Sequence, residues 1–150
     1  MVVTEQSMNI LTGIDFGESS AKITDEAVSL ARGLDAKLWF VHVAEPDPEF
    51  VGYEADSTQM RDVVAKRYHA EHRELQALAQ TVREQGLDCV ALLVQGPTVE
   101  TLLTEATKVS ADMIVIGSHG KGVLKRLLIG STSEGISHRS EVPVHIVPTR

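Results

Sequence analysis

Glycine and hydroxyl residues gather near the C-terminal end of the chain, in the run GSHGKGVLKRLLIGSTSEGI. Within it, Gly117, Gly120 and the pair Gly130-Ser131 form the pattern G-x2-G-x9-G-S. Because glycine has no Cβ, a ligand can come close to the backbone there, and a glycine turn can point successive N–H groups at an anion. The pattern therefore favours a loop that holds a phosphate-bearing ligand through its backbone.

The residues around these glycines suit the same chemistry. Ser131 and Thr132 would begin a helix, whose free N–H groups and positive dipole end favour an anion, and their hydroxyls can donate further hydrogen bonds. Ser118 and His119 are candidate contacts as well. The loop before Gly130 also carries three cations and no acidic residue: Lys121, Lys125 and Arg126. The alternative is a glycine-rich surface turn with solvated cations and an ordinary serine cap.

Two other phosphate-binding motifs are excluded, because the sequence lacks the glycine spacing that each requires. The chain contains no G-x4-G-K-[ST], and no G-x-G-x-x-G follows the first expected strand. His119 could titrate near neutrality, but no carboxylate partner is evident in the sequence, so a solvated or structural histidine is favoured over a catalytic one. The six histidines show no metal-ligand spacing, and any metal is expected to be Mg²⁺ held by nucleotide phosphates.

The elements that must position this loop follow from hydrophobic periodicity, which predicts five strands and four helices. The strands are expected at 8–14, 37–43, 89–95, 112–116 and 142–147, and the helices from Ser19 or Ser20 to Gly33 and at 57–85, 98–109 and 131–139, with a loop at 45–56. Strands that alternate with helices are almost always parallel, with right-handed crossovers. The sequence thus predicts an α/β fold, with one domain over residues 1–150, a doubly wound parallel sheet and helices on both faces.

Doubly wound sheets bind ligands outside the carboxyl ends of their strands, where the strand order reverses. Asp15 follows the first expected strand, and Gly117 follows the fourth. Both are therefore candidate ligand contacts. Asp15 could instead be a turn or capping residue for the first helix.

Composition limits the function classes open to the chain. Its 150 residues are 43% hydrophobic and 23% charged, as in ordinary globular proteins. The formal net charge of -7 argues against non-specific nucleic-acid binding, which requires a basic surface. No apolar run is long enough to cross a membrane, no secretory signal is recognisable, and the single cysteine, Cys89, rules out an internal disulfide. The expected location is the cytoplasm, with no membrane or nucleic-acid partner.

The chain resembles the universal stress protein family over essentially its whole length. The matching segments are ILTGIDFGESS at the first strand, FVHVAEPD at the second, and ADMIVIGSHGKGVLKRLLIGSTSEGISHRSEVPVHIVP at the C-terminal end. The last segment is highly specific, since strand, glycine loop, helix and final strand match in order and spacing. The resemblance implies a five-stranded sheet of order 3-2-1-4-5, a homodimer, and membership of the ATP-binding branch that the pattern G-x2-G-x9-G-[ST] marks.

The resemblance also implies roles for individual residues. Asp15 would contact the nucleoside, and the backbone of Val43 would meet the edge of the adenine. Gly117 and Gly120 would lie along the ribose and the phosphates, and Gly130, Ser131 and Thr132 would bind the phosphates. Two departures from the family pattern stand out. Gly13 lies in the adenine pocket where many ATP-binding members have proline, and Gly122 adds a glycine to the loop.

The leading hypothesis is a regulatory stress-response protein that binds an adenine nucleotide (ATP, or else AMP or cyclic AMP) and acts as a homodimer. The final strand, 142–147, is short and apolar, and if it is an edge, pairing with its twin across a two-fold axis would cover it. The second hypothesis is a slow ATPase or an enzyme that phosphorylates itself on Ser131, Thr132 or Ser133, although no clear base is present. The third is a nucleotide-free interaction module that works through its dimer surface.

Overall fold

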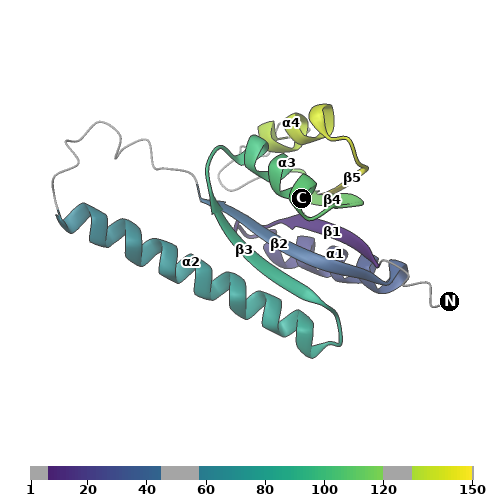
Figure 1. Ribbon diagram of the computed structural model, residues 1–150, viewed down its shortest axis with the longest axis horizontal. Coiled ribbons are helices and arrows are strands. Elements are labelled where there is room, and N and C mark those ends of the chain that lie inside the picture. Colours follow the sequence, from purple (N-terminus) through teal and green to yellow (C-terminus); the bar gives the residue numbers. More distant parts are fainter. Residues whose placement is uncertain (1–6, 45–57, 120–129, 150) are drawn as a thin grey trace.

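The computed structural model of the chain describes residues 7–44, 58–119 and 130–149, except for the side chains of residues 58–60. Strands and helices alternate along these residues (Figure 1). The described strands are β1 (Met8–Gly13), β2 (Ala36–Ala44), β3 (Cys89–Gln95), β4 (Met113–Gly117) and β5 (Val144–Val147). The described helices are α1 (Ser20–Leu34), α2 (Thr58–Glu84), α3 (Thr98–Lys108) and α4 (Ser131–Arg139). The loop expected at 45–56 lies outside the described residues.

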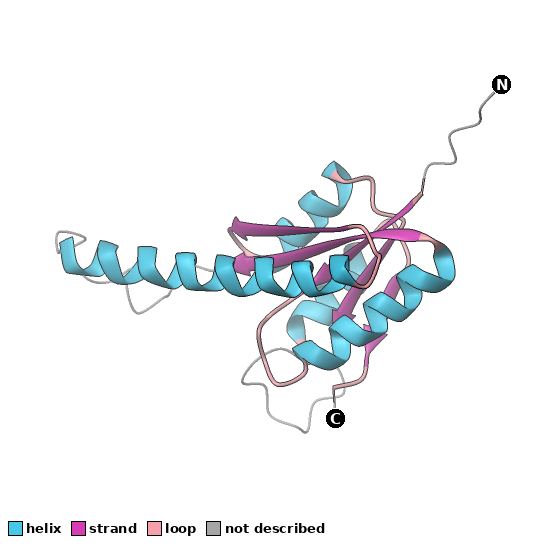
Figure 2. Ribbon diagram, turned by 90° about the horizontal axis from the view of Figure 1, so that it is seen from below, coloured by secondary structure: helices cyan, strands magenta, loops and turns pink. Residues whose placement is uncertain are grey.

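The strands form one parallel sheet in the order β3-β2-β1-β4-β5. The chain moves outward from β1 to β3, then crosses back to β4 beside β1 and ends at β5. α1 and α2 cover one face of the sheet (Figure 2), and α3 and α4 cover the other. The α/β fold, the doubly wound sheet and the strand order 3-2-1-4-5 are thereby confirmed.

The core is divided between the two faces because consecutive strand residues point to opposite sides of a sheet. Ile10 and Phe40 pack on the side of α1 and α2, whereas their neighbours Leu11 and Val41 pack on the side of α3 and α4. All four side chains are fully buried. A strand that is buried on both faces is apolar at nearly every position, which explains the continuous apolar runs in the sequence.

α1 begins at Ser20, as predicted, but ends later than predicted. Ser19 is the N-cap residue but makes no capping hydrogen bond, and the hydroxyl of Ser20 donates to Oδ1 of Asp15, 3.3 Å away. At its other end, the helix continues past Gly33. Asp35 then takes the left-handed conformation (φ 52°) that is more common for glycine. The left-handed residue that ends the helix is therefore Asp35, two residues after the predicted Gly33.

α2 is much longer than the strands that it covers (Figure 1). At 1.5 Å per residue, its 27 residues make a helix of roughly 40 Å, whereas the 7 residues of β3 span roughly 23 Å. Leu75, Ala79 and Val82 bury its C-terminal half against the sheet, and its N-terminal half projects past the strands. Val63, which lies in this projecting half, is 57% exposed.

Cys89 begins β3 and is 1% exposed. Burial raises the pKa of its thiol to about 12. Because only the thiolate is nucleophilic, and an ordinary cysteine has a pKa near 8.5, we expect the native protein to react with iodoacetamide about 10³-fold more slowly than a cysteine peptide at mildly alkaline pH. Mass spectrometry after timed exposure measures this rate. The same protein in denaturing urea is the control, and equal rates in the two conditions would contradict the prediction.

Candidate functional site

A pocket of about 530 Å³ lies at the carboxyl ends of the strands. β1 and β4, which border it, are neighbours in the sheet but lead into helices on opposite faces. They therefore form the switch point at which doubly wound folds bind ligands. The residues that line the pocket are Gly13, Ile14, Asp15, Ile23, Val41, His42, Val43, Ala44, Arg67, Glu71, Thr98, Leu102, Ile116, Gly117, His119, Gly130, Ser131, Thr132 and Ser133.

Most of the candidate site residues lie on the wall of this pocket. They are Gly13, Asp15, Val43, Gly117, His119, Gly130, Ser131 and Thr132. Ser118 lies behind the wall, while Gly120 and Lys121 fall outside the described residues, as do Gly122, Lys125 and Arg126. The fold thus brings together candidates from β1, β2, the end of β4 and the start of α4. Their contact with a ligand stays a prediction.

Ser118 ties the two described ends of the glycine loop to the C-terminal segment. Its carbonyl oxygen accepts a hydrogen bond from the N–H of Gly130 at 2.7 Å, and its own N–H donates to the carbonyl of Val147 at 2.8 Å. Its hydroxyl lies 3.0 Å from Oγ1 of Thr149 and 3.1 Å from Nδ1 of His119. Since Ser118 is 8% exposed, its side chain supports the wall of the pocket from within.

The start of α4 lies on the wall of the pocket, and the first N–H groups of a helix have no partner within the helix. Gly130 is the N-cap residue and has no side chain that could cap them. Ser131 and Thr132 line the pocket. Ser133, which is 2% exposed, donates its hydroxyl to the carbonyl of Gly117 and so ties α4 to the end of β4. A helix N-terminus attracts anions through its amides and its dipole, and this one is held at the pocket wall.

Asp15 is a turn residue and a pocket residue at the same time. Its Oδ1 accepts hydrogen bonds from the N–H of Gly17 at 2.9 Å and from the hydroxyl of Ser20 at 3.3 Å. The two roles that the sequence left open for Asp15 are therefore compatible, because the turn fixes the carboxylate beside the pocket at the end of β1.

Gly117 and Gly13 both lie in the pocket wall, but a side chain at each would meet different neighbours. A Cβ at Gly117 would come within 2.7 Å of Cδ1 of Ile23 and 3.1 Å of Cγ2 of Thr149. The protein itself therefore fills the Cβ side of Gly117, where the sequence predicted room for a ligand. A Cβ at Gly13 would lie 3.3 Å from Cγ2 of Ile116, which also lines the pocket. A side chain at Gly13 would thus press on the pocket wall.

Sequence reasoning missed the contribution of α2. Arg67 and Glu71 line the pocket from this helix. The buried stripe of α2 runs from Leu75 to these two residues at helical spacing. A charged pair on the apolar stripe of an amphipathic helix was the available signal. On β2, Nδ1 of His42 lies 2.6 Å from the carbonyl oxygen of Ile14.

The described residues contain no group of three or more histidine, cysteine or carboxylate side chains that could hold a metal ion. Among the described helices, none is both long enough and apolar enough to span a bilayer.

The sheet and its pocket place the chain among the doubly wound α/β proteins. The sequence model of the universal stress protein family matches residues 7–148, and the chain belongs to this family. A universal stress protein from Thermus aquaticus is 31% identical over 140 residues, which cover 92% of this chain and 96% of that protein. The stress response protein NhaX from Bacillus subtilis is 30% identical over 159 residues, with the same coverage of 92% and 96%.

Solved structures share the fold at lower sequence identity. The hypothetical protein MJ0577 is 22% identical and has a TM-score of 0.80, with 96% of this chain and 97% of that one covered. A universal stress protein in complex with cAMP is 22% identical, with a TM-score of 0.65 and coverage of 96% and 98%. A universal stress protein from Archaeoglobus fulgidus in complex with dAMP is 19% identical, with a TM-score of 0.64 and coverage of 93% and 97%.

Proposed function

We propose that this universal stress protein binds an adenine nucleotide, with ATP as the main ligand, and acts as a regulatory stress-response protein in the form of a homodimer. The observation that carries the proposal is the start of α4, whose N–H groups and hydroxyls border a pocket of about 530 Å³ at the switch point of the sheet. The pattern G-x2-G-x9-G-S, which marks the ATP-binding branch of the family, ends at the same point. The complexes of two structural relatives with cAMP and dAMP support the choice of an adenine nucleotide.

The surfaces of the pocket favour one orientation of the nucleotide. The phosphates would lie at the α4 end, where the amides and hydroxyls of Ser131 and Thr132 can donate hydrogen bonds. The base would lie at the β2 end, where Val43 and Leu102 contribute apolar surface. Asp15 would accept hydrogen bonds from the nucleoside. Mg²⁺ would be bound through the phosphates, since the described residues form no metal-binding cluster.

The edge strand β5 supports the homodimer. It lies at one end of the strand order, so only one side of its backbone pairs with a strand of the described chain. The carbonyls of Pro143 and Val147 accept hydrogen bonds from the β4 side. Because backbone groups alternate in direction along a strand, the N–H and C=O groups of Val144 and Ile146 point outward. These groups would pair with β5 of a second copy across a two-fold axis.

Thermal melting with and without Mg-ATP, AMP and cyclic AMP tests this proposal. At several hundred to a thousand times its dissociation constant, ATP should stabilise the fold by about 3–4 kcal/mol and raise the melting temperature accordingly. Absence of any shift at millimolar nucleotide would favour the nucleotide-free interaction module. A phosphate-release assay on the same samples separates binding from catalysis. Steady release that a loop variant abolishes would support the slow ATPase instead.

A further inference from the structure

The carbonyl of Ile14 determines where the neutral ring of His42 carries its proton. Nδ1 of His42 lies 2.6 Å from that carbonyl oxygen. A carbonyl oxygen only accepts hydrogen bonds, so a contact this short requires the proton on Nδ1. When the ring is neutral, Nε2 is then an acceptor without a proton.

Nε2 of His42 faces a carboxylate on α2. Oε2 of Glu71 lies 3.4 Å from it, and the exposed side-chain fractions are 12% for His42 and 24% for Glu71. Oε2 is buried and has no hydrogen-bond partner among the described residues. With a neutral ring, two acceptors face each other, which is destabilising for buried groups. A second proton, on Nε2, turns the same contact into an ion pair between opposite charges.

The charged groups around the pair are compatible with a protonated ring. Nε of Arg67 lies 4.0 Å from Oε1 of Glu71, the oxygen other than the one that faces His42. The ring of Phe16, after β1, packs on His42 with ring centroids 4.5 Å apart. Among the described residues, the other titratable or charged groups that line the same pocket are Asp15 and His119. The carboxylates of Asp15 and Glu71 favour an imidazolium, whereas Arg67 opposes it from the far side of Glu71.

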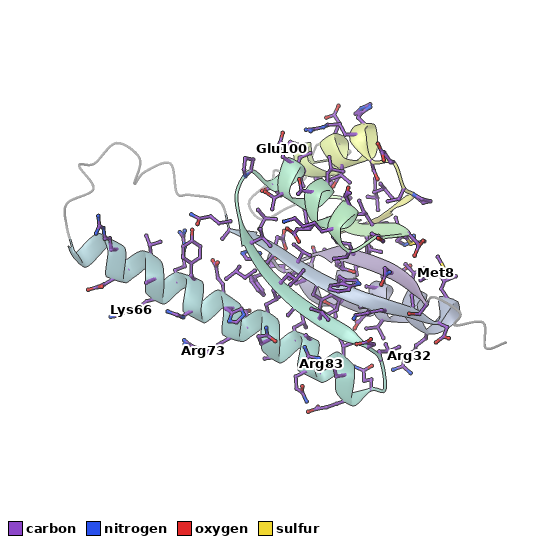
Figure 3. The ribbon with its side chains drawn as sticks, in the orientation of Figure 1. Met8, Arg32, Lys66, Arg73, Arg83 and Glu100 are labelled. Atoms are coloured by element: carbon purple, nitrogen blue, oxygen red, sulfur yellow. The ribbon has the colours of Figure 1, made fainter. Side chains whose placement is uncertain are left out.

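The contact is also well placed to hold α2. Ile14, His42 and Glu71 come from the end of β1, from β2 and from α2, and all three line the pocket. Glu71 lies one turn before Leu75, where the buried part of the helix begins. By contrast, Lys66 and Arg73 are exposed on the outer side of α2 (Figure 3).

We propose that His42 and Glu71 form a proton-linked clamp that positions α2 at the pocket and strengthens nucleotide binding as the pH falls. His42 acts through Glu71 and α2, so it is a positioning residue. The clamp is complete when His42 carries a proton on both ring nitrogens, and it opens when Nε2 loses its proton. Its effect on the ligand rests on the proposed nucleotide binding, but its effect on the apo protein does not.

The variant Glu71→Gln tests the clamp. It keeps the shape of the side chain, and its amide can donate to the bare Nε2 of a neutral His42. Glu74→Gln is the matched control, because it removes the same charge from an exposed position on the same helix. Calorimetry should give an ATP dissociation constant that is about fivefold or more higher at about pH 8 than at about pH 5, in the wild type and in Glu74→Gln. In Glu71→Gln it should stay constant or fall.

The apo protein provides a second readout that needs no nucleotide. The melting temperature should decline with rising pH more steeply in the wild type than in Glu71→Gln, because the other five histidines contribute equally to both. Histidine-selective ¹⁵N NMR should find the proton of neutral His42 on Nδ1. Identical pH profiles in the two proteins, or a neutral ring protonated on Nε2, would overturn the clamp. Failure of ATP to bind at any pH would instead overturn the proposed function.

Discussion

Replacing Gly130 with valine should weaken ATP binding about 10- to 100-fold and leave the fold intact. Gly130 has φ -71° and ψ 161°, a backbone conformation that any residue adopts, and its N–H can still donate to Ser118. The residue is buried and lines the pocket, so a branched side chain would occupy space in front of the amides of α4. Overpacking of this kind costs about 1–3 kcal/mol, and 1.4 kcal/mol is a tenfold change in affinity. Titration calorimetry with ATP measures the loss.

Gly33→Val is the matched control for this variant. A Cβ at Gly33, on the exposed side of α1, meets nothing within 4 Å. This variant should bind ATP as the wild type does, and neither substitution should change the oligomeric state. Wild-type affinity in Gly130→Val would show that the phosphates lie away from the start of α4.

Replacing Ile146 with proline should raise the dissociation constant of the homodimer at least about 30-fold while the monomer stays folded. Proline removes the outward N–H of Ile146 in both copies, which eliminates two hydrogen bonds of about 1 kcal/mol each. The hydrogen bonds to β4 are made by Pro143, Val147 and His145, which lies between the two outward residues Val144 and Ile146. These bonds therefore stay in place. Proline is tolerated on edge strands for the same reason. Light scattering over a concentration series measures the equilibrium.

Ile146→Ala separates the role of the N–H from that of the side chain. It truncates a side chain that packs against the core on the α3 and α4 side, yet it keeps the backbone donor. This variant should lose some stability and remain dimeric at concentrations where Ile146→Pro is monomeric. If the proline variant stays dimeric with unchanged affinity, the two copies pair through a surface other than β5.

The sequence by itself was sufficient to place most of the fold. The strands are short and apolar on both faces, and the helices between them have a clear periodicity, so both can be identified from local pattern. Placement of Asp15 after β1 and Gly130 before α4 follows from the same pattern. The order of the strands does not, because right-handed crossovers leave more than one doubly wound order open. That order came from the resemblance to the universal stress protein family.

Only the tertiary structure decided what the residues of the site contact. From the sequence, Gly117 is predicted to leave room for a ligand beside the backbone, but Ile23 of α1 packs against it. In the sequence, Glu71 is one of many polar residues of α2, but in the structure it faces His42 at the pocket wall. The physical reason is one of range. Local patterns report on neighbours within a turn or a few residues, whereas these contacts join segments far apart in the chain and depend on how a long helix lies across the sheet.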